Sequence, residues 1–527
     1  NIYCCHSTGC ISSGSDPIID VMKRVIEENS LQEVIRIVPT GCMGLCAQGP
    51  LVRIEIKGQK DVLYKMLTAE NMEEIMKDHV LPALKVGENE GFNLSANLEK
   101  YMLSLDLPFF TRQEKVVLKD AGHIDPEDLH EYIAHGGYLA LQKVLKTMKP
   151  EEVVEEMKKS GLRGRGGGGF STGMKWQIAA SVPTVDEKFI ICNGDEGDPG
   201  AYMDRSILEG NPHEVIEGMM IGAYAIGATE GWFYIRAEYP LAVERVEKAI
   251  KDCKKNMLLG KNIMGSNFSF NIEVRLGAGA FVCGEETALI RSIEGNRGTP
   301  RPRPPYPTDH GIWGKPSCVN NVETLANVPA IILKGADWFS SFGTETSKGT
   351  KVFALTGQVE HSGLIEVPMG TPINDIVNVI GGGVPEGKTL KAVQTGGPSG
   401  GVIPLEKLDL PVCYECLKSV GSIMGSGGMI VMDDSSNMVD IAHFYLDFTV
   451  DESCGKCAPC RIGGKQMLIL LDKFKRGRGT PKDLENLQTI ATAMQKASLC
   501  GLGQTAPNPV LSTIEFFPQE YQDKMKK

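Results

Sequence analysis

The sequence predicts a multidomain α/β protein. Its 527 residues are enough for about three to four domains of ~150 residues each. Strand-like apolar runs at 188–192 and 231–236 flank a helical pattern at 212–226, an alternation typical of a mostly parallel sheet. Two glycine-rich stretches, 161–176 and 276–289, each lead into a helix and predict a ligand lodged between them.

The first glycine-rich stretch is the strongest single signal in the chain. Seven of the residues at 161–176 are glycine, which disfavours a packed strand or helix and favours close approach of a ligand to the backbone. Exposed N–H groups, with Arg163, Arg165 and Lys175 nearby and a helix starting near Gly173, predict a phosphate cradle for a nucleotide or flavin. A flexible linker is the alternative, but such linkers rarely carry these charged and aromatic residues.

Known phosphate motifs fit this stretch poorly. A P-loop needs Gly-Lys-Ser/Thr after its glycines, and that sequence is missing here. The spacing Gly164-x-Gly166-x-x-Gly169 matches a dinucleotide fingerprint by letter only.

Polar residues follow the strand at 188–192. We expect Asn193, Asp195, Glu196 and Asp198 to hold ribose hydroxyls or an amide, with an ordinary acidic surface turn as the alternative.

The second glycine-rich stretch has two carboxylates where its helix opens. Glu285 and Glu286 complement a helix N-terminus, so a structural role is the alternative to ligand contact. The proline-rich segment 298–307 is expected to be stiff and extended, which places Arg303 and Tyr306. Asn320 and Asn321 open a further helix.

Fifteen cysteines indicate metal or iron–sulfur ligation if the compartment is reducing. Cys454, Cys457 and Cys460, each separated from the next by two residues, with Cys500 as a distant fourth, predict a [4Fe–4S] cluster better than zinc. Helices at 461–474 and 481–496 would carry it.

Two further cysteine pairs lie near the start of the chain. Cys5 and Cys10, with Cys42 and Cys46, are predicted to lie in glycine-containing loops and to hold a [2Fe–2S] cluster near solvent, suited to exchange with a partner. A zinc site and unligated thiols are the alternatives, and Cys4 is an alternative to Cys5. Cys413 and Cys416 are interpreted as free thiols, because no second pair lies close in sequence.

The net charge of −11 is spread along the chain, which argues against nucleic-acid binding. We see no run of 18 apolar residues and no signal-peptide pattern, so we expect no membrane insertion and a cytoplasmic location.

Several motifs together resemble a known family. Residues 161–176, 193–205, 283–289 and 316–324 resemble the 51 kDa-type flavoprotein subunit of complex I and its relatives in NAD-linked hydrogenases and formate dehydrogenases, over about 150–510. The cysteine pairs before residue 85 resemble the thioredoxin-like [2Fe–2S] domain of the 24 kDa-type subunits.

The resemblance implies cofactors and roles. FMN would be bound by Gly164, Arg165, Gly166, Gly167, Lys175, Asn193, Asp195, Glu196, Gly284, Glu285, Glu286, Val319, Asn320 and Asn321. NAD(P)H would stack on Phe170, near Asp198, Arg303 and Tyr306, with Glu286 and Lys175 as the catalytic pair. Ile178, Asp198, Arg303 and Tyr306 depart from the family pattern, which leaves NAD and NADP both open.

The resemblance also implies the domain order: a thioredoxin-like [2Fe–2S] domain at 1–85, a helical connector at 86–150, a Rossmann-like FMN and NAD(P)H domain at 151–345, a β-grasp domain at 346–445 and a helical [4Fe–4S] bundle at 446–527.

The implied function is oxidation of NAD(P)H, or the reverse, with electrons passed to iron–sulfur clusters. The fused [2Fe–2S] domain and the stretch 421–428 look most like the β subunit of electron-bifurcating [FeFe]-hydrogenases. Implied partners are a catalytic iron–sulfur α subunit, a small [2Fe–2S] γ subunit and ferredoxin. The alternative is an electron-relay or scaffold subunit of a formate dehydrogenase, a complex I-like dehydrogenase or a ferredoxin-coupled reductase.

Overall fold

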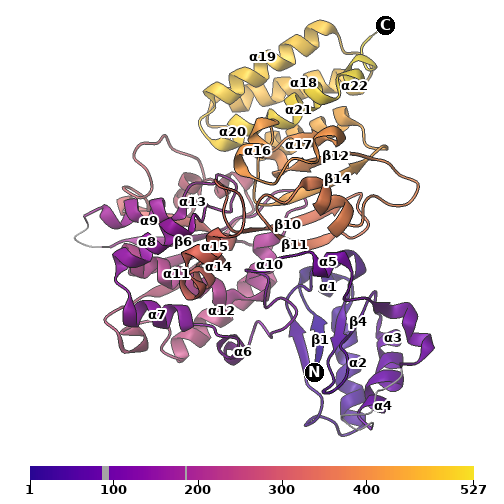
Figure 1. The fold of residues 1–527 in the computed structure, drawn as a ribbon. Coiled ribbons are helices and arrows are strands. Elements are labelled where there is room, and N and C mark those ends of the chain that lie inside the picture. Colours follow the sequence, from indigo (N-terminus) through magenta and orange to yellow (C-terminus); the bar gives the residue numbers. More distant parts are fainter. Residues whose placement is uncertain (86–93, 184–186, 527) are drawn as a thin grey trace.

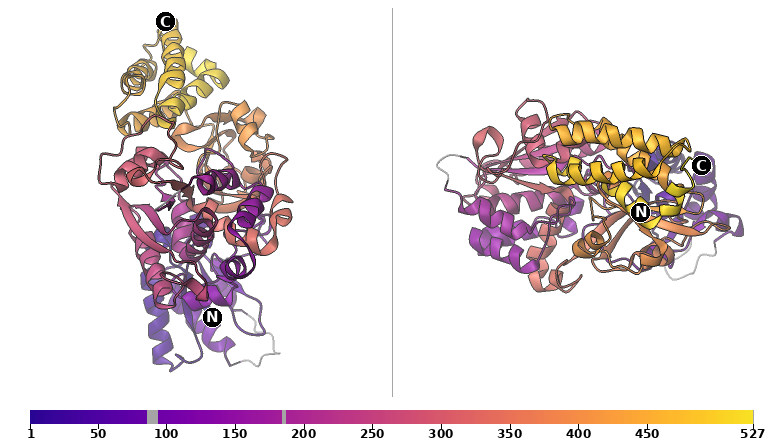
Figure 2. Two further views of the ribbon diagram at one scale, coloured as in Figure 1. Left: turned by 90° about the vertical axis from the view of Figure 1, so that its left-hand side faces the viewer. Right: turned by 90° about the horizontal axis from the view of Figure 1, so that it is seen from above.

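The computed structural model describes residues 1–85, 94–183 and 187–526. In these residues two five-stranded sheets and one four-stranded sheet are joined by helices, which confirms the predicted α/β class. The N-terminal part and the C-terminal helices lie at opposite ends of an elongated molecule (Figures 1 and 2). Within the described ranges, no helix is both long enough and apolar enough to cross a membrane.

The N-terminal part has a mixed sheet in the order β2-β1-β3-β4-β5, in which β1 is parallel to β2 and antiparallel to β3. The amphipathic helix α2 buries Ile18, Met22 and Val25 against it. The sheet includes β5, which follows the boundary expected at residue 85. The elements are β1 (Ile2–Cys5), α1 (Thr8–Ser12), α2 (Ser15–Glu28), β2 (Ile37–Thr40), η1 (Cys46–Gln48), β3 (Val52–Ile54), β4 (Val62–Tyr64), α3 (Ala69–Ile75), η2 (Met76–Val80), α4 (Leu81–Ala83), η3 (Ala96–Tyr101) and β5 (Met102–Leu103).

Short helices lead from this part to the central sheet, in the order β8-β7-β6-β9, whose neighbouring strands are all parallel. Parallel strands end at the same edge, so the residues that follow β6 and β9 come together. The elements are α5 (Pro108–Thr111), α6 (Leu129–Ala134), α7 (Leu139–Thr147), α8 (Pro150–Ser160), α9 (Thr172–Ser181), β6 (Phe189–Gly194), α10 (Met203–Gly210), α11 (Pro212–Ile226), β7 (Glu230–Arg236), α12 (Pro240–Lys255), η4 (Ile263–Gly265), β8 (Asn271–Gly277), η5 (Phe281–Gly284), α13 (Glu286–Ile293), η6 (Ile312–Gly314), β9 (Ser317–Asn321), α14 (Val322–Lys334) and α15 (Ala336–Ser340).

The third sheet has the order β11-β10-β14-β12-β13, with β10 and β14 parallel and the other neighbours antiparallel. Its core is continuous with the cysteine region of the N-terminal part, because Cys5, Cys10 and Leu45 belong to the same buried cluster as Phe353 and Ile365. The elements are β10 (Thr350–Gly357), β11 (Gly363–Pro368), η7 (Asp375–Ile380), β12 (Leu390–Thr395), η8 (Gly397–Ser399), β13 (Val402–Pro404), η9 (Leu405–Lys407), α16 (Tyr414–Ser419) and β14 (Gly428–Asp433).

The C-terminal part is helical and forms its own core around Leu446, Met467, Leu471, Phe474 and Leu487. The predicted helix at 461–474 begins as the π-helical turn η10 and continues as α18. The elements are α17 (Met438–Asp451), η10 (Pro459–Gly463), α18 (Gly464–Lys475), α19 (Pro481–Ala497), α20 (Gly501–Thr505), α21 (Asn508–Phe516) and α22 (Pro518–Gln522).

Candidate functional site

The glycine loop between α8 and α9 needs its glycines for conformation and for space. Gly167 has φ +110° and Gly169 has φ +62°, a region that other residues rarely adopt. A Cβ on Gly167 would lie 3.1 Å from the Cα of Gly425, whereas a Cβ on Gly168 would meet no atom of the described chain within 4 Å. The loop is therefore closed on one side by the third sheet's loops and open at Gly168.

The two arginines of this loop do not line its open side, which corrects the expectation that their charges form the cradle. Arg165 is fully buried, and its Nη2 donates to the carbonyl of Lys348 at 2.6 Å. Arg163 donates to Glu415 Oε1 at 2.6 Å and stacks over the ring of Tyr414 at 4.2 Å. Both guanidinium groups are held by contacts with the loop backbone and with distant segments, because Arg163 Nε donates to the carbonyl of Gly169 and Arg165 Nη1 to that of Arg163. Neither is left free to bind a phosphate group at the open side.

The expected polar residues meet at the carboxyl ends of β6 and β9. Asn193 Nδ2 donates to the carbonyl of Gly284 at 3.0 Å and so ties β6 to the second glycine turn. Trp176, from α9, donates to Asn320 Oδ1 at 3.0 Å. Lys175 Nζ donates to the carbonyl of Val319 at 3.0 Å.

Three carboxyl groups follow β6, of which Asp195 and Glu196 are buried and Asp198 is partly buried. Burial raises the pKa of Asp195 to about 7, that of Glu196 to about 7 and that of Asp198 to about 6. Glu196 accepts from the backbone N–H groups of Asp204 and Arg205, at the start of α10. Asp198 accepts from Ser426 Oγ at 2.8 Å.

Asp195 differs from its neighbours. Neither of its buried side-chain oxygens has a hydrogen-bond partner among the described residues, and Arg236 Nη1 lies 3.7 Å from Oδ1. Buried polar atoms are normally paired, so this carboxyl group fits a ligand that donates a hydrogen bond, such as a ribityl hydroxyl. Together with the open glycine loop, it shows that the residues fit FMN.

Glu285 and Glu286 have separate surroundings. Glu285 is the N-cap of α13 and accepts from the N–H groups of Thr287 and Ala288 at 3.0 and 3.1 Å, as the structural alternative expected. Glu286 lies 3.3 Å from Lys175 Nζ and 2.8 Å from Arg303 Nη1. Burial raises its pKa, but these two cations outweigh burial and leave the pKa below the usual value.

Large apolar and aromatic side chains are exposed on three segments that carry predicted binding residues. Phe170 is 55% exposed at the end of the glycine loop, and Tyr306 is 52% exposed. Ile178 also reaches the surface, from α9. Exposed aromatic faces suit stacking with a planar ligand.

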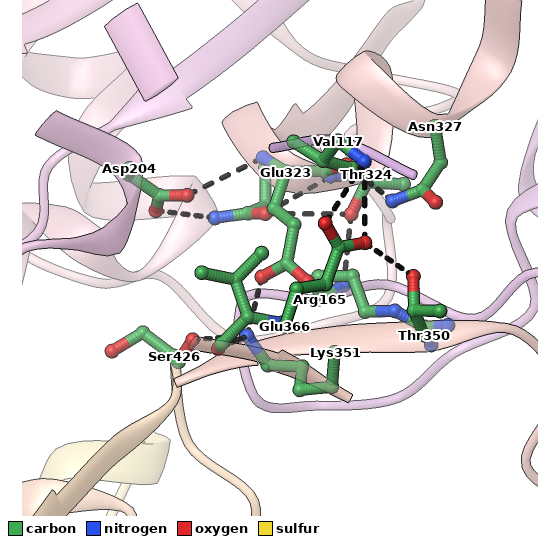
Figure 3. Close-up of polar contacts among 12 residues, drawn as sticks. Val117, Arg165, Asp204, Glu323, Thr324, Asn327, Thr350, Lys351, Glu366 and Ser426 are labelled. Atoms are coloured by element: carbon green, nitrogen blue, oxygen red, sulfur yellow. Dashed lines mark hydrogen bonds and ion pairs between the residues drawn. The ribbon is translucent and has the colours of Figure 1, made fainter. Parts of the chain in front are cut away.

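A buried polar network lies next to the glycine loop and includes Arg165, Asp204, Glu323 and Lys351 (Figure 3). Lys351 and Glu323 form a fully buried ion pair, and Lys351 also donates to the carbonyl of Ser426 at 2.6 Å. Asp204 accepts from Asn321 Nδ2 at 2.6 Å, and burial raises its pKa well above the usual value. The network joins α10, β9, α14, β10 and the loop before β14. It reaches the glycine loop through Thr324 of α14, whose Oγ1 accepts from the N–H of Arg165 at 2.8 Å.

We expect Lys351→Met to lower the free energy of unfolding by about 3–5 kcal/mol, because it leaves Glu323 buried without its partner charge. The matched control is Lys482→Met, which breaks the exposed pair with Glu485 and should cost less than about 1 kcal/mol. Urea unfolding of both variants measures the difference. An equal loss of unfolding free energy in the two variants would show that buried Glu323 does not need the charge of Lys351.

The C-terminal cysteines converge on one cavity. Cys454, Cys457, Cys460 and Cys500 all line it, together with Val282 and Pro300. Ser453 Oγ lies 3.2 Å from Cys460 Sγ, and Arg297 donates to the carbonyl of Cys454. Four thiols around one cavity fit a [4Fe–4S] cluster, and Val282 places the cavity directly beside the second glycine turn.

The N-terminal cysteines also come together. Cys10 Sγ lies 3.2 Å from Cys5 Sγ, Cys42 Sγ lies 3.6 Å from Cys46 Sγ, and Cys5 also contacts Cys42. Their convergence fits a [2Fe–2S] cluster. Cys4 points into a different buried cluster, because neighbouring side chains of a strand face opposite ways, so Cys5 is the member of the set.

Two expectations about these cysteines are wrong. Cys10 lies in the helix α1, not in a loop. Cys5, Cys10 and Cys42 are buried and only Cys46 is exposed. The region faces inward because Gly44 packs against β11, where Leu364 N–H donates to its carbonyl at 2.7 Å.

Cys413 and Cys416 form a disulfide, which corrects the interpretation as free thiols. Their short spacing at the start of α16 brings the two sulfur atoms within bonding distance. The sequence analysis does not identify three residues that support the site. Tyr414 donates to the glycine loop at Gly164, Ser426 donates to Asp198, and Lys351 donates to the carbonyl of Ser426. Two features of the sequence could have identified two of them: Lys351 stands at the edge of an apolar strand, and Ser426 belongs to the glycine-rich stretch at 421–428.

Known proteins share these features. Residues 157–330 match the Nuo51 FMN-binding domain, residues 440–524 the NADH-ubiquinone oxidoreductase-F iron-sulfur binding region, and residues 1–79 the thioredoxin-like [2Fe-2S] ferredoxin. The chain is 58% identical over 411 residues to the NADP-reducing hydrogenase subunit HndC of Solidesulfovibrio fructosivorans, covering 78% of this chain and 83% of that protein.

Two further proteins are similar over most of the chain. The F-type subunit of the NADH-quinone oxidoreductase of Escherichia coli (strain K12) is 40% identical over 403 residues, which are 76% of this chain and 91% of that protein. The structure of an NAD+-reducing [NiFe]-hydrogenase in the air-oxidized state aligns with a TM-score of 0.68 and 31% identity, covering all of this chain and 85% of that one.

Fold, site and comparisons define a flavin- and iron–sulfur-dependent oxidoreductase subunit with FMN, [2Fe–2S] and [4Fe–4S] cofactors and NAD(P)H as substrate. The chain belongs to the Nuo51 family of FMN-binding flavoproteins, together with the F-type subunits of NADH-quinone oxidoreductases. FMN, when bound, accepts a hydride as two electrons and releases electrons singly.

Proposed function

We propose that this chain is the NAD(P)H-oxidising subunit of a cytoplasmic, electron-bifurcating hydrogenase complex. Its partners would be a catalytic iron–sulfur α subunit, a small [2Fe–2S] γ subunit and ferredoxin. The identity with the NADP-reducing hydrogenase subunit supports the hydrogenase assignment. We also propose the five-part division with boundaries near 85, 150, 345 and 445, although the N-terminal sheet takes its last strand from Met102–Leu103.

One observation carries the proposal. The cavity of the four C-terminal cysteines has Val282 and Pro300 in its wall, and Val282 lies in the turn that also contains Gly284 and Glu285. Short separation favours passage of single electrons, so a donor at the glycine turns has its acceptor next to it. A scaffold that only relays electrons would not need the open loop and the exposed aromatic residues.

The proposed roles follow the geometry. The phosphate group of FMN would be bound by the backbone of the glycine loop, at Gly164, Arg165, Gly166 and Gly167. The other polar groups of FMN would be bound by the side chains of Asn193, Asp195, Asn320 and Asn321. Phe170 would stack on the nicotinamide. Lys175 and Glu286 would orient the reacting rings as a charged pair, since they lie 3.3 Å apart.

The choice between NAD and NADP depends on Arg303 in this proposal. Arg303 is exposed and pairs with Glu286 at 2.8 Å. The positive charge of Arg303 is therefore partly neutralised before it could pair with the 2′-phosphate of NADP. Asp198 is occupied by Ser426, which leaves its carboxylate less free to accept from a 2′-hydroxyl.

The test uses the purified, FMN-loaded chain. We expect reduction of an artificial dye with NADH or NADPH, and a comparison of kcat/KM for the two donors assigns the nucleotide. A loaded chain that retains FMN and reduces no dye with either donor would instead be an electron-relay subunit. Co-purification of the hydrogenase subunits from the native host tests the partners.

The N-terminal cluster gives a separate prediction. Cys46→Ala should remove the [2Fe–2S] EPR signal while NADH-to-dye activity stays near that of the wild type, because Cys46 is an exposed member of the set and the flavin site lies elsewhere. The reaction of the complete complex should fall strongly. The control is Cys4→Ser, a buried neighbour outside the set. A retained [2Fe–2S] signal in Cys46→Ala would contradict the ligand assignment.

A further inference from the structure

The Cys413–Cys416 disulfide stands apart in this chain. The other thirteen cysteines are unpaired, and all fifteen lie in the described residues. The bond closes a ring with only two intervening residues, and so short a ring restricts the unfolded chain little. A structural cross-link is therefore a poor explanation for the pair.

The two residues inside the ring hold the glycine loop. Tyr414 Oη donates to the carbonyl of Gly164 at 2.8 Å, and its ring packs against Gly169, where an added Cβ would lie 2.7 Å away. Glu415 pairs with Arg163 at 2.6 Å. Arg163 in turn donates from Nε to the carbonyl of Gly169 at 2.6 Å. The constraint on Tyr414 and Glu415 is thereby transmitted to both sides of the loop.

The pair also has the geometry for thiol exchange. Cys413 is 2% exposed, whereas Cys416 is partly exposed and is therefore the more accessible residue of the pair. The N–H of Cys416 donates to Cys413 Sγ at 2.9 Å. That hydrogen bond stabilises Cys413 as a leaving thiolate, and a better leaving thiolate speeds exchange.

We propose that Cys413–Cys416 is a thiol–disulfide exchange site through which a dithiol reductant loosens the glycine loop and its hold on FMN. This inference rests on the proposed placement of FMN at that loop. A thiolate of the external dithiol attacks Sγ of Cys416, the bond to Cys413 breaks, and Cys413 leaves as a thiolate. The second external thiolate then attacks the mixed disulfide and releases Cys416. The dithiol is oxidised to its own disulfide, and two electrons with two protons pass to the cysteine pair.

Opening of the ring removes the constraint that keeps Tyr414 against Gly164 and Gly169. We expect FMN to dissociate about fivefold faster from the reduced form, as loss of one well-placed hydrogen bond would predict. Re-oxidation should restore the slow rate.

The experiment uses the FMN-loaded full chain, kept without oxygen in buffers of stepped reduced-to-oxidised dithiothreitol ratio. Alkylation followed by peptide mass spectrometry reports the state of Cys413 and Cys416, and fluorescence of released FMN reports its dissociation. The double variant Cys413→Ser/Cys416→Ser should release FMN fast in every buffer, and it controls for effects of dithiothreitol on the clusters. Tyr414→Phe should still open its disulfide but lose the response of FMN.

A pair that stays closed to alkylation in reduced dithiothreitol would overturn the exchange site. A pair that opens while FMN dissociation stays constant in the wild type would overturn the coupling. Failure of the underlying FMN placement is distinguishable, because Gly167→Val would then retain FMN whatever the state of the disulfide.

Discussion

Gly167→Val should yield a folded chain that has lost FMN and NADH-dependent dye reduction while its iron–sulfur clusters remain. Gly167 has φ +110°, and the new side chain would also meet the backbone of Gly425. Strain of about 1–3 kcal/mol at such a position predicts a loss in FMN affinity of about fivefold to 150-fold. Flavin content per chain and dye reduction measure it.

The matched control is Gly477→Val at φ +65°, where an added Cβ would meet no atom of the described chain within 4 Å. It carries left-handed strain without a clash and lies in the C-terminal helical part, so FMN content should be unchanged. Stoichiometric FMN in purified Gly167→Val would show that the loop is not the flavin cradle.

Cys457→Ala should leave FMN reducible by NADH and abolish the flow of electrons beyond it. Cys457 is one of four cysteines that line a single cavity, and loss of one of the four thiolates disrupts a [4Fe–4S] cluster. We expect stopped-flow bleaching of FMN at the rate of the wild type and a fall of about a hundredfold or more in reduction of the physiological acceptor, a barrier increase of about 2.7 kcal/mol.

Ser453→Ala is the control for that cavity. Ser453 Oγ lies 3.2 Å from Cys460 Sγ, so its removal deletes a polar contact and keeps all four thiols. Its turnover should stay within a few-fold of the wild type. Undiminished turnover in Cys457→Ala itself would mean that electrons leave FMN by another route.

Individual helices and strands could be predicted from the sequence. The helix expected at 212–226 is observed as α11 (Pro212–Ile226), which begins with proline and is followed by Gly227 at φ +75°. The strand expected at 231–236 is β7 (Glu230–Arg236). Local signals such as helix caps and apolar periodicity decide these elements, and they need no tertiary information.

Side-chain direction could not be predicted in the same way. Arg165 belongs to a loop that reads as a phosphate cradle, yet its guanidinium binds Lys348, a residue far along the chain. The sequence predicts a solvent-near cluster at Cys5, Cys10, Cys42 and Cys46, but only Cys46 is exposed, because the third sheet covers the others. In both cases the outcome depends on packing between distant segments, which spacing along the sequence does not encode.

The central claim is that electrons pass from NAD(P)H through FMN to the cluster beside the second glycine turn. The most direct measurement mixes the FMN-loaded chain with NADH or NADPH without oxygen, follows FMN absorbance in stopped flow and records EPR spectra of rapidly frozen samples. We predict that FMN is reduced first, that the [4Fe–4S] signal follows, and that FMN-free chain shows neither change. Reduction of the [4Fe–4S] cluster in FMN-free chain, or no cluster reduction after complete reduction of FMN, would contradict this account.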